Sequence, residues 1–272
     1  MANLAEASTA AAAAAAAPSR GGAPCSQTKW HQPIGPTIPS SPTGVPPRRP
    51  TRVTLPGKSV TIEPLSPSHA SDLYAIIEGE SKAHLFTYLF DEPYTTPSAF
   101  SAAVTTKSQS EDPLFFALVD KETNTAVGWA SLMRIDPNHR VVEVGNILFS
   151  PALQRTRAAT EAMYLLARYV FEDLGYRRYE WKCDNLNLPS KRAAIRLGFT
   201  FEGVFRKHMV YKGRSRDTAW FAMVDEDWPV IKKAFEDWLR DENFDESGRQ
   251  KRRLEDLREL MPGQRGPVVL EL

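Results

Sequence analysis

Two arginines stand at the start of a predicted helix, a position that favours a ligand of opposite charge. Arg155 and Arg157 come just before the stretch 158–172, whose apolar residues recur at helical spacing. The first turn of a helix offers unpaired backbone N–H groups and a partial positive charge. Two cations there oppose the helix dipole unless an anion is bound, and guanidinium groups suit phosphate. The segment therefore predicts a phosphate-bearing ligand, with two solvated loop arginines as the alternative.

A second segment has the residue types of a capped helix whose first turn can also hold a ligand. Asn187 precedes a predicted helix over 189–197, and Ser190 lies in its first turn. Gly198 is expected to end that helix, and Phe199 to enter the core. Asn is a common N-capping residue, so plain capping is the alternative to ligand binding. Both roles can hold at once.

The hydrophobic pattern between residues 57 and 242 predicts the scaffold that positions these segments. Strands are predicted over 59–65, 114–119, 126–135, 141–149, 178–183, 199–210 and 217–224. Helices are predicted over 68–78, 97–107, 158–172, 189–197 and 229–240. Ser68 is the expected N-cap of the first helix. Strands outnumber helices, and one strand–helix–strand unit lies in the middle, so we expect an α+β domain with a mixed sheet.

Both ends of the chain differ from this middle part. Residues 1–56 contain an alanine run, Ala10–Ala17, and recurring prolines, so we predict a disordered arm. Residues 243–272 are predicted to form a charged tail that contains a helix. A thin apolar stripe runs along that tail, formed by Leu254, Leu257 and Leu260. The stripe indicates a weakly docked or solvated helix, with a partner site as the alternative.

Composition excludes several classes of protein. Of the 272 residues, 42% are hydrophobic and 25% charged, and the formal net charge is +1. Neither a nucleic acid nor a membrane surface is implied as a partner by that balance. No apolar run reaches the roughly 18 residues of a membrane span. No Cys/His cluster has metal-ligand spacing, so no metal site is predicted.

The two cysteines and the N-terminal composition bear on location. Cys25 and Cys183 lie in different contexts, so we expect no disulfide and a reducing compartment. A mitochondrial presequence is not predicted, because Arg20 is the first basic residue and Glu6 precedes it. We therefore expect a cytoplasmic protein, with the nucleus as the alternative.

The segment Val141 to Phe199 resembles the GNAT superfamily of N-acetyltransferases. It is closest to the branch that includes ribosomal-protein N-terminal acetyltransferases, and a looser resemblance extends from about residue 58 to 240. The family's Q/R-x-x-G-x-G/A loop corresponds to Gln154–Ala159, where Arg157 replaces the usual glycine. The branch's N-x-x-S-x-R…L-G-F signature corresponds to Asn187–Phe199 and is the more specific of the two motifs.

The resemblance implies that the chain binds acetyl-CoA or a related acyl-CoA and passes the acyl group directly to an amine. It implies that strand 141–149 carries a bulge and diverges from the next parallel strand, leaving a wedge for the pantetheine. Backbone N–H groups near Leu148 and Phe149 would pair with the coenzyme there. The implied cofactor-binding residues are Leu148, Phe149, Gln154, Arg155, Thr156, Arg157, Ala158, Ala159, Thr160, Asn187, Ser190 and Arg192.

An amine must lose a proton before or during attack on a thioester, so a base is useful. Glu143, on the central strand, is the first candidate; its alternative role is to orient substrate or pair with an arginine. Asp217 and His208 are further candidate bases. Many GNAT enzymes have a general-acid tyrosine where this chain has Ala194, which leaves the acid unassigned. Cys183 is expected to be a buried strand residue rather than a nucleophile.

Three functions follow as hypotheses. The first is an N-acyltransferase that acts on a small-molecule amine or a protein N-terminus. The second is a non-catalytic acyl-CoA-binding or scaffold module, motivated by Arg157 and the absent tyrosine. The third is a nucleic-acid-associated protein, motivated by Lys251–Arg253 but weakened by the acidic residues that follow. The resemblance also implies that the aromatic segment Leu85–Phe90, with Tyr94, lies over the acceptor side, with a core role as the alternative.

Overall fold

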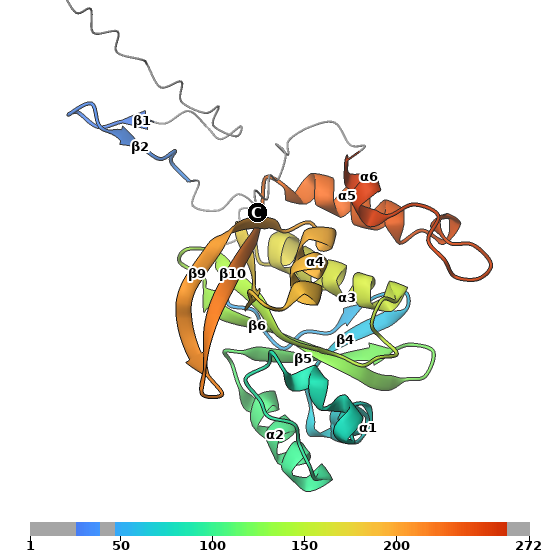
Figure 1. The fold of residues 1–272 in the computed structure, drawn as a ribbon. Helices are drawn as coiled ribbons and strands as arrows, with labels where there is room; N and C mark the ends of the chain where they lie inside the picture. The colour runs from blue at the N-terminus through green and yellow to red at the C-terminus, as the bar shows by residue number, and fades with distance from the viewer. Residues whose placement is uncertain (1–25, 39–46, 260–272) are drawn as a thin grey trace, which may run out of the picture.

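A single mixed sheet organises the part of the chain that the computed structural model describes, residues 26–38 and 47–259. Its strand order is β3-β4-β5-β6-β7-β8-β10-β9 (Figure 1). In chain order these strands are β3 (Leu55–Pro56), β4 (Val60–Pro64), β5 (Leu114–Asp120), β6 (Thr125–Asp136), β7 (Val141–Phe149), β8 (Arg178–Asp184), β9 (Thr200–Tyr211) and β10 (Arg214–Val224). All neighbouring strands are antiparallel except β7 and β8, which are parallel. The predicted mixed, mostly antiparallel sheet is confirmed.

Helices pack on both faces of this sheet (Figure 1). The α-helices are α1 (Ala70–Ile77), α2 (Pro97–Gln109), α3 (Arg157–Arg168), α4 (Leu188–Leu197), α5 (Trp228–Trp238) and α6 (Leu254–Glu259). Short 3-10 helices are η1 (Pro67–His69), η2 (Glu80–Phe86) and η4 (Asp241–Asn243), and a π-helical turn, η3 (Tyr169–Asp173), continues α3. A separate two-stranded sheet pairs β1 (Ser26–Gln27) with β2 (Pro33–Ile34).

Strand alternation divides the apolar residues between two cores. On β5, Phe116 and Leu118 join the large core that also contains α3, α4 and α5. Phe115 and Ala117 join a smaller core with α1 and α2 on the opposite face. Successive strand residues point to opposite faces, so β5 is buried on both sides, as its continuous apolar run requires.

Capping residues set the start of the helices, and one predicted cap was wrong. Ser66, not Ser68, is the N-cap: its Oγ accepts from the Ser68 N–H at 3.3 Å, and Pro67 occupies the first helical position of η1. Proline suits that position because its missing N–H would be unpaired there and its φ is already helical. Helix α1 then begins at Ala70, two residues later than the predicted start.

The packed core extends beyond residues 57–242 at both ends. Leu55 is buried in the large core, and Thr51 donates its backbone N–H to the Tyr169 hydroxyl at 3.0 Å. In α6, Leu254 and Leu257 are buried in the same core. These two leucines therefore face the domain rather than a partner. The alanine run and Leu260 lie outside the described residues.

The end of α4 is where the C-terminal segment docks. Gly198 ends α4 at φ 109°, a backbone conformation that L side chains rarely adopt, and a Cβ there would meet Ile231 of α5. Arg258 of α6 donates to the main-chain oxygens of Arg196 at 2.9 Å and Ile195 at 3.3 Å. The Ile195 oxygen also accepts from the Gly198 N–H at 3.1 Å, so α6 adds donors to two carbonyls at the end of α4, where helical donors run out.

Candidate active site

Strands β7 and β8 diverge midway along their length. Their parallel pairing runs from Val141–Arg178 to Val144–Trp181 and stops there, although both strands continue. At the same place the register between β6 and β7 shifts, and Asn146 takes a left-handed φ of 51°. An extra residue on one strand bends that strand away from its neighbour. The bulge and the wedge implied by the GNAT resemblance are both present.

The close approach of β6 to this bulged strand needs a glycine. A Cβ on Gly128 would lie 2.5 Å from the main-chain oxygen of Leu148 and 3.3 Å from the Cα of Phe149. Real Cβ atoms do not approach a backbone oxygen so closely. Any side chain at position 128 would therefore push β7 outward and change the wedge.

A cleft of 330 Å³ occupies the wedge. Six of the predicted site residues line it: Glu143, Leu148, Phe149, Gln154, Asn187 and Ser190. The other seven do not line it: Arg155, Thr156, Arg157, Ala158, Ala159, Thr160 and Arg192. The aromatic segment contributes both to the cleft and to the core, because Tyr88 and Phe90 line the cleft whereas Phe86 is buried.

The strand register distinguishes the N–H groups of Leu148 and Phe149. Phe149 lies opposite Gly128, and the next residue, Ser150, donates its N–H to the Val127 oxygen at 3.0 Å. In an antiparallel pair, hydrogen-bonding groups point alternately toward and away from the partner strand. The N–H of Phe149 therefore points away from β6 and into the wedge. Its carbonyl faces the same way and accepts from the Gln154 side chain at 3.0 Å.

Helix α3 presents free donors at its N-terminus. Thr156 is the N-cap: its Oγ1 accepts from the N–H of Ala159 at 3.1 Å, and its carbonyl accepts from the N–H of Thr160. Within the described chain, the N–H groups of Arg157 and Ala158 have no such acceptor. Unpaired N–H groups at a helix start are a ready site for an anion. Just before them, Arg155 is exposed and has a left-handed φ of 63°.

The side chain of Arg157 points elsewhere. Its guanidinium pairs with Asp241 at 2.7 Å, donates to the main-chain oxygen of Leu239, and lies 4.7 Å from the centre of the Phe244 ring. Asp241 also pairs with Lys58. We call Lys58, Arg157 and Asp241 the C-terminal clasp. In place of the family's glycine, the chain has a residue whose side chain holds the segment after α5.

Three further predicted residues are buried beside the clasp, and one is exposed. Ala158 and Ala159 are buried in the large core, as is expected for small residues that let a helix approach a sheet. Thr160 accepts from Arg196 of α4 at 3.1 Å, which ties the two helices together. Arg192 is exposed on the surface of α4. None of these side chains lines the cleft.

At the start of α4, capping and cleft lining coincide. The Asn187 Oδ1 accepts from the Ser190 N–H at 3.1 Å, which is the N-cap bond that the sequence predicts. The Ser190 hydroxyl accepts from the Trp181 indole N–H at 3.0 Å. Both side chains are thus held in place at the wall of the cleft. The amide N–H₂ of Asn187 remains available to a ligand.

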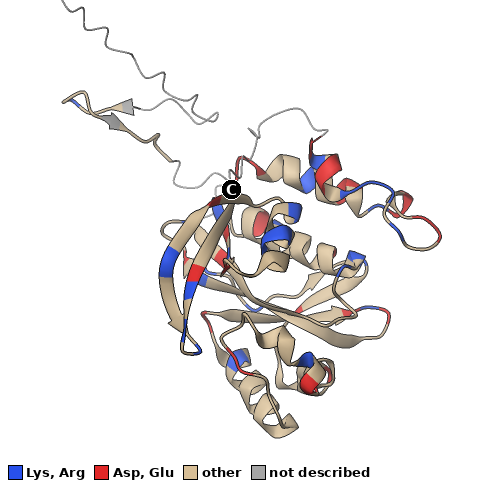
Figure 2. Cartoon of the chain, in the orientation of Figure 1, with Lys and Arg blue, Asp and Glu red and all other residues tan. Residues whose placement is uncertain are grey.

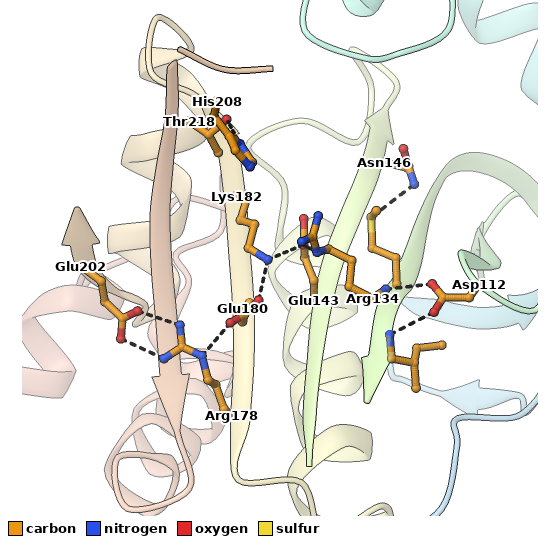
Figure 3. Close-up of polar contacts among 12 residues, drawn as sticks. Asp112, Arg134, Glu143, Asn146, Arg178, Glu180, Lys182, Glu202, His208 and Thr218 are labelled. Atoms are coloured by element: carbon orange, nitrogen blue, oxygen red, sulfur yellow. Dashed lines mark hydrogen bonds and ion pairs between the residues drawn. The ribbon is translucent and has the colours of Figure 1, made fainter. Parts of the chain in front are cut away.

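Glu143 lies on β7 beside the point where the strands part, and it is 7% exposed. Its carboxylate pairs with the Lys182 ammonium at 2.9 Å and with Arg134 at 3.5 Å (Figure 3). Burial raises the pKa of Glu143, and the two cations offset that effect only in part. The Glu143 carboxylate therefore takes up a proton at a higher pH than an exposed glutamate does.

Lys182 is the central cation of a buried row of charges. Its side chain is 5% exposed and pairs with Glu180 at 2.6 Å as well as with Glu143. Its ammonium also lies 3.8 Å from the centre of the Trp220 ring. Burial works to raise the pKa of Glu180, but Lys182 and Arg178 together hold it below its ordinary value. We call Glu143, Glu180 and Lys182 the cleft cluster.

The cleft cluster reaches the surface through one arginine. Arg178 pairs with Glu180 at 2.7 Å and with Glu202 of β9 at 2.6 Å (Figure 3). These charged residues alternate along β8 with Tyr179 and Trp181, which belong to the large core. The cleft cluster consequently lies on the sheet face opposite α3.

The other candidate catalytic residues have structural partners. Asp217 accepts from the Lys207 N–H at 2.7 Å at a bulge between β9 and β10. His208 bonds the Thr218 hydroxyl at 3.0 Å, and burial with nearby cations lowers its pKa. Cys183 is buried, as predicted, and burial raises the pKa of its thiol. Ala194, where many GNAT enzymes are expected to have a tyrosine, is fully buried.

Lys182 and Arg216 line the cleft but were not predicted from the sequence. The available signal was the alternation of charged and aromatic residues in the stretch Arg178–Asp184, which places Lys182 on the same strand face as Glu180. For Arg216 the signal was weaker, because a bulge in β10 interrupts the alternation between it and Thr218.

Further features of the described part of the chain concern metal sites, membrane spans and basic surface patches. Its His, Cys, Asp and Glu side chains form no group of three able to hold a metal ion. None of its helices is long and apolar enough to cross a bilayer. The basic residues 251–253 are exposed, but Arg253 lies near Glu255 and Asp256, and Figure 2 shows both signs of charge along this segment.

Comparison with known proteins finds relatives of the part of the chain that forms the cleft. The model of the acetyltransferase (GNAT) domain matches residues 59–200. A GCN5-related N-acetyltransferase from Brucella melitensis is 48% identical, with a TM-score of 0.77 over 79% of this chain and 98% of that one. A GNAT-family structure from Chromobacterium violaceum is 34% identical, with a TM-score of 0.66 over 73% of this chain and 99% of that one.

Curated and ligand-bound relatives agree with this match. YnaD of Bacillus subtilis, an N-acetyltransferase, is 24% identical over 58% of this chain and 90% of its own. The ribosomal L7/L12 acetyltransferase RimL, solved with coenzyme A, shares the fold at 20% identity and a TM-score of 0.55, over 64% of this chain and 99% of that one. With the family's bulged strand and wedge present as well, the chain belongs to the GNAT family and is an N-acetyltransferase whose donor is acetyl-CoA.

Proposed function

We propose that this enzyme transfers the acetyl group directly to a primary amine, with Glu143 as the general base. The observation that carries the proposal is the place of Glu143: a buried carboxylate in the cleft, on the strand that supplies the Phe149 N–H. Burial raises its pKa, and a base whose pKa approaches the working pH is the more effective. A small molecule and a protein N-terminus both offer the amine that this chemistry needs.

Two backbone features support the placement of the donor. The unpaired N–H groups of Arg157 and Ala158 suit the coenzyme's phosphates, with exposed Arg155 beside them. The wedge between β7 and β8 suits the narrow pantetheine chain, and Asn187 lies at its wall. We therefore assign phosphate binding at this loop to the Arg157 backbone rather than to its guanidinium, which is engaged by Asp241.

The chemistry balances with these groups. The amine nitrogen bonds to the carbonyl carbon and the carbon–sulfur bond breaks, while Glu143 receives the proton from nitrogen. The Phe149 N–H stabilises the charge that develops on the carbonyl oxygen, as a fixed donor does in an oxyanion hole. Solvent supplies the proton to the departing thiolate, because Ala194 stands where many GNAT enzymes have a general-acid tyrosine.

The test is Glu143→Gln, which keeps the size of the side chain but removes its basicity. We expect kcat to fall by roughly 10²–10⁴-fold, the usual contribution of a general base. Coenzyme A thiol release with a panel of primary amines gives the rate, and calorimetry with acetyl-CoA gives the affinity, which should stay unchanged.

Glu122→Gln, at an exposed turn, is the matched control and should leave the rate unchanged. A Glu143→Gln enzyme with full activity would remove Glu143 from the mechanism. Acetyl-CoA binding by the wild-type chain without turnover of any amine would favour the non-catalytic module instead.

A further inference from the structure

Arg216 of β10 is a buried cation without a counter-charge. The residue is 7% exposed, and its guanidinium lies beside two rings that contact each other, 5.7 Å from the centre of Phe90 and 5.6 Å from that of Tyr211. Its Nε donates to the Thr218 hydroxyl at 3.1 Å. Among residues 26–38 and 47–259, no carboxylate pairs with Arg216, and its two Nη groups donate to no acceptor.

The surrounding carboxylates are already committed. Asp184 lines the same cleft, but its Oδ2 accepts from the Tyr211 hydroxyl at 2.8 Å and its Oδ1 from the Leu186 N–H at 2.9 Å. Asp217, the neighbour of Arg216 in sequence, accepts from the Lys207 N–H. Both carboxylates thus have hydrogen-bond partners of their own, and within the described residues neither forms an ion pair with Arg216.

Other cations in the molecule show what Arg216 lacks. Arg178 has two carboxylates, and Arg157 has one carboxylate and a main-chain oxygen. A guanidinium removed from water without an anion loses hydration that aromatic contacts replace only in part. A bound anion would replace the lost hydration by accepting two parallel hydrogen bonds from the Nη groups.

The position of Arg216 identifies the molecule that would supply the anion. Arg216 and Glu143 line the same cleft. Through Thr218 and His208, Arg216 continues the sheet face that carries the cleft cluster, opposite α3 and its phosphate-binding N-terminus. Of the cations that line the cleft in the described part of the chain, Lys182 is matched by two glutamates, which leaves Arg216 for a ligand.

We propose that Arg216 binds a carboxylate of the acceptor, so that the substrate is an amine that also carries a carboxylate group. This assignment rests on the proposed acetyl transfer to an amine. A free amino acid and a peptide with an acidic residue both offer this chemistry. Arg216 thereby selects the acceptor, while Glu143 takes its proton.

The experiment compares matched acceptors in the full chain saturated with acetyl-CoA. Free amino acids are set against their carboxamides, and C-terminally amidated dipeptides with glutamate second are set against the same peptides with glutamine. Thiol release gives kcat/KM. We expect the carboxylate member of one pair type to be favoured roughly ten- to hundredfold, as a charged hydrogen-bonded pair allows. A preference among the free amino acids would identify a free amino acid as the acceptor, whereas a preference among the dipeptides would identify a peptide.

Arg216→Gln should abolish that preference and leave the affinity for acetyl-CoA unchanged. Arg214→Gln, on the same strand but exposed, is the matched control and should keep the preference. Acetylation of amines without any carboxylate preference, or a preference that survives Arg216→Gln, would overturn the inference and leave the proposed function standing. A loss of acetyl-CoA affinity in Arg216→Gln would also overturn it, because the anion would then belong to the donor.

Calorimetry keeps the two proposals separable. The coenzyme A complex is titrated with the N-acetylated product of each carboxylate acceptor and with its carboxamide. If the protein acetylates no amine but binds the carboxylate members selectively through Arg216, the proposed function is contradicted and the anion site is supported. Equal binding of both members, or of neither, would overturn the anion site.

Discussion

The cleft cluster and the C-terminal clasp use the same pattern of charges in opposite surroundings. In the cleft cluster, one cation lies between two carboxylates, and Lys182 and Glu143 are 5% and 7% exposed. In the clasp, one carboxylate lies between two cations, and Lys58 and Asp241 are 63% and 65% exposed. Water screens the second set but not the first, so equal distances do not imply equal energies.

The comparison teaches that burial, and not the number of ion pairs, decides which charges control chemistry. In the cleft cluster, burial shifts the pKa of Glu143 upward against two nearby cations. In the clasp, Lys58 and Arg157 hold the pKa of Asp241 below its ordinary value, a shift in the ordinary direction for an exposed carboxylate. The first arrangement tunes a reactive group, whereas the second fastens a segment of chain.

The largest effect is expected for Lys182→Met, which keeps the length of the side chain and removes its charge. Glu143 and Glu180 would then be buried together without their common cation. Breaking a buried ion pair on one side costs about 3–5 kcal/mol of unfolding free energy. Urea unfolding at pH 7 measures the change.

The double variant Glu143→Gln, Lys182→Met is the control, because it removes one of the stranded carboxylates. It should recover part of the lost stability. A Lys182→Met protein as stable as the wild type would show that the cleft cluster is solvated in solution, and the contrast with the clasp would disappear.

A smaller but more specific effect is expected in the pH dependence of kcat/KM. Glu143 must be ionised to accept a proton, and its pKa in the folded protein lies above the ordinary 4.5. Activity should therefore rise with pH along a limb whose midpoint lies above 4.5, and Glu143→Gln should lack that limb. A limb at or below the ordinary value would contradict the assigned burial.

The raised pKa of Glu143 affects stability in the opposite direction to activity. Folding raises this pKa, so the folded state binds the proton more tightly. The resulting stabilisation is complete below the unfolded-state pKa of about 4.5 and is lost as the pH rises through the folded-state value. Activity and this part of the unfolding free energy should thus move in opposite directions across the same pH range.

The smallest effect is expected for Asp241→Asn in the clasp. Exposed ion pairs contribute little and are screened by salt. The variant should unfold at nearly the same urea concentration as the wild type, and any difference should vanish as salt is raised. A large, salt-independent loss would mean that the clasp behaves like the buried cleft cluster.

The sequence was sufficient for seven of the eight strands, because strand periodicity and the motif around Asn187–Phe199 are local signals; β3 lies within the predicted arm. The bulge near Asn146 followed only from the resemblance, since no residue type there demands it. Lys182 was not recognised, because its partner Glu143 lies on the neighbouring strand and pairing between strands is not written in local spacing. Arg216 was missed for a similar reason, as its ring contacts come from β9 and the segment after η2.

The side chain of Arg157 shows most clearly what local sequence cannot predict. Seen locally, an arginine at a helix start favours an anionic ligand, and the sequence supported that interpretation. Its actual anion, Asp241, lies 84 residues along the chain. A protein carboxylate and a ligand phosphate pair equally well with a guanidinium group on electrostatic grounds, so only the fold distinguishes them.

The docking of α6 sets an order of events during synthesis. Ribosomes build chains from the N-terminus at about 5–20 residues per second, and domains start to fold as they emerge. A nascent chain that ends at Trp238 has all eight strands of the sheet but lacks Leu254, Leu257 and the Arg258 contacts that close α4. All residues of the wedge are thus synthesised before those that complete its supporting core, and the clasp can form only after Asp241 has been added.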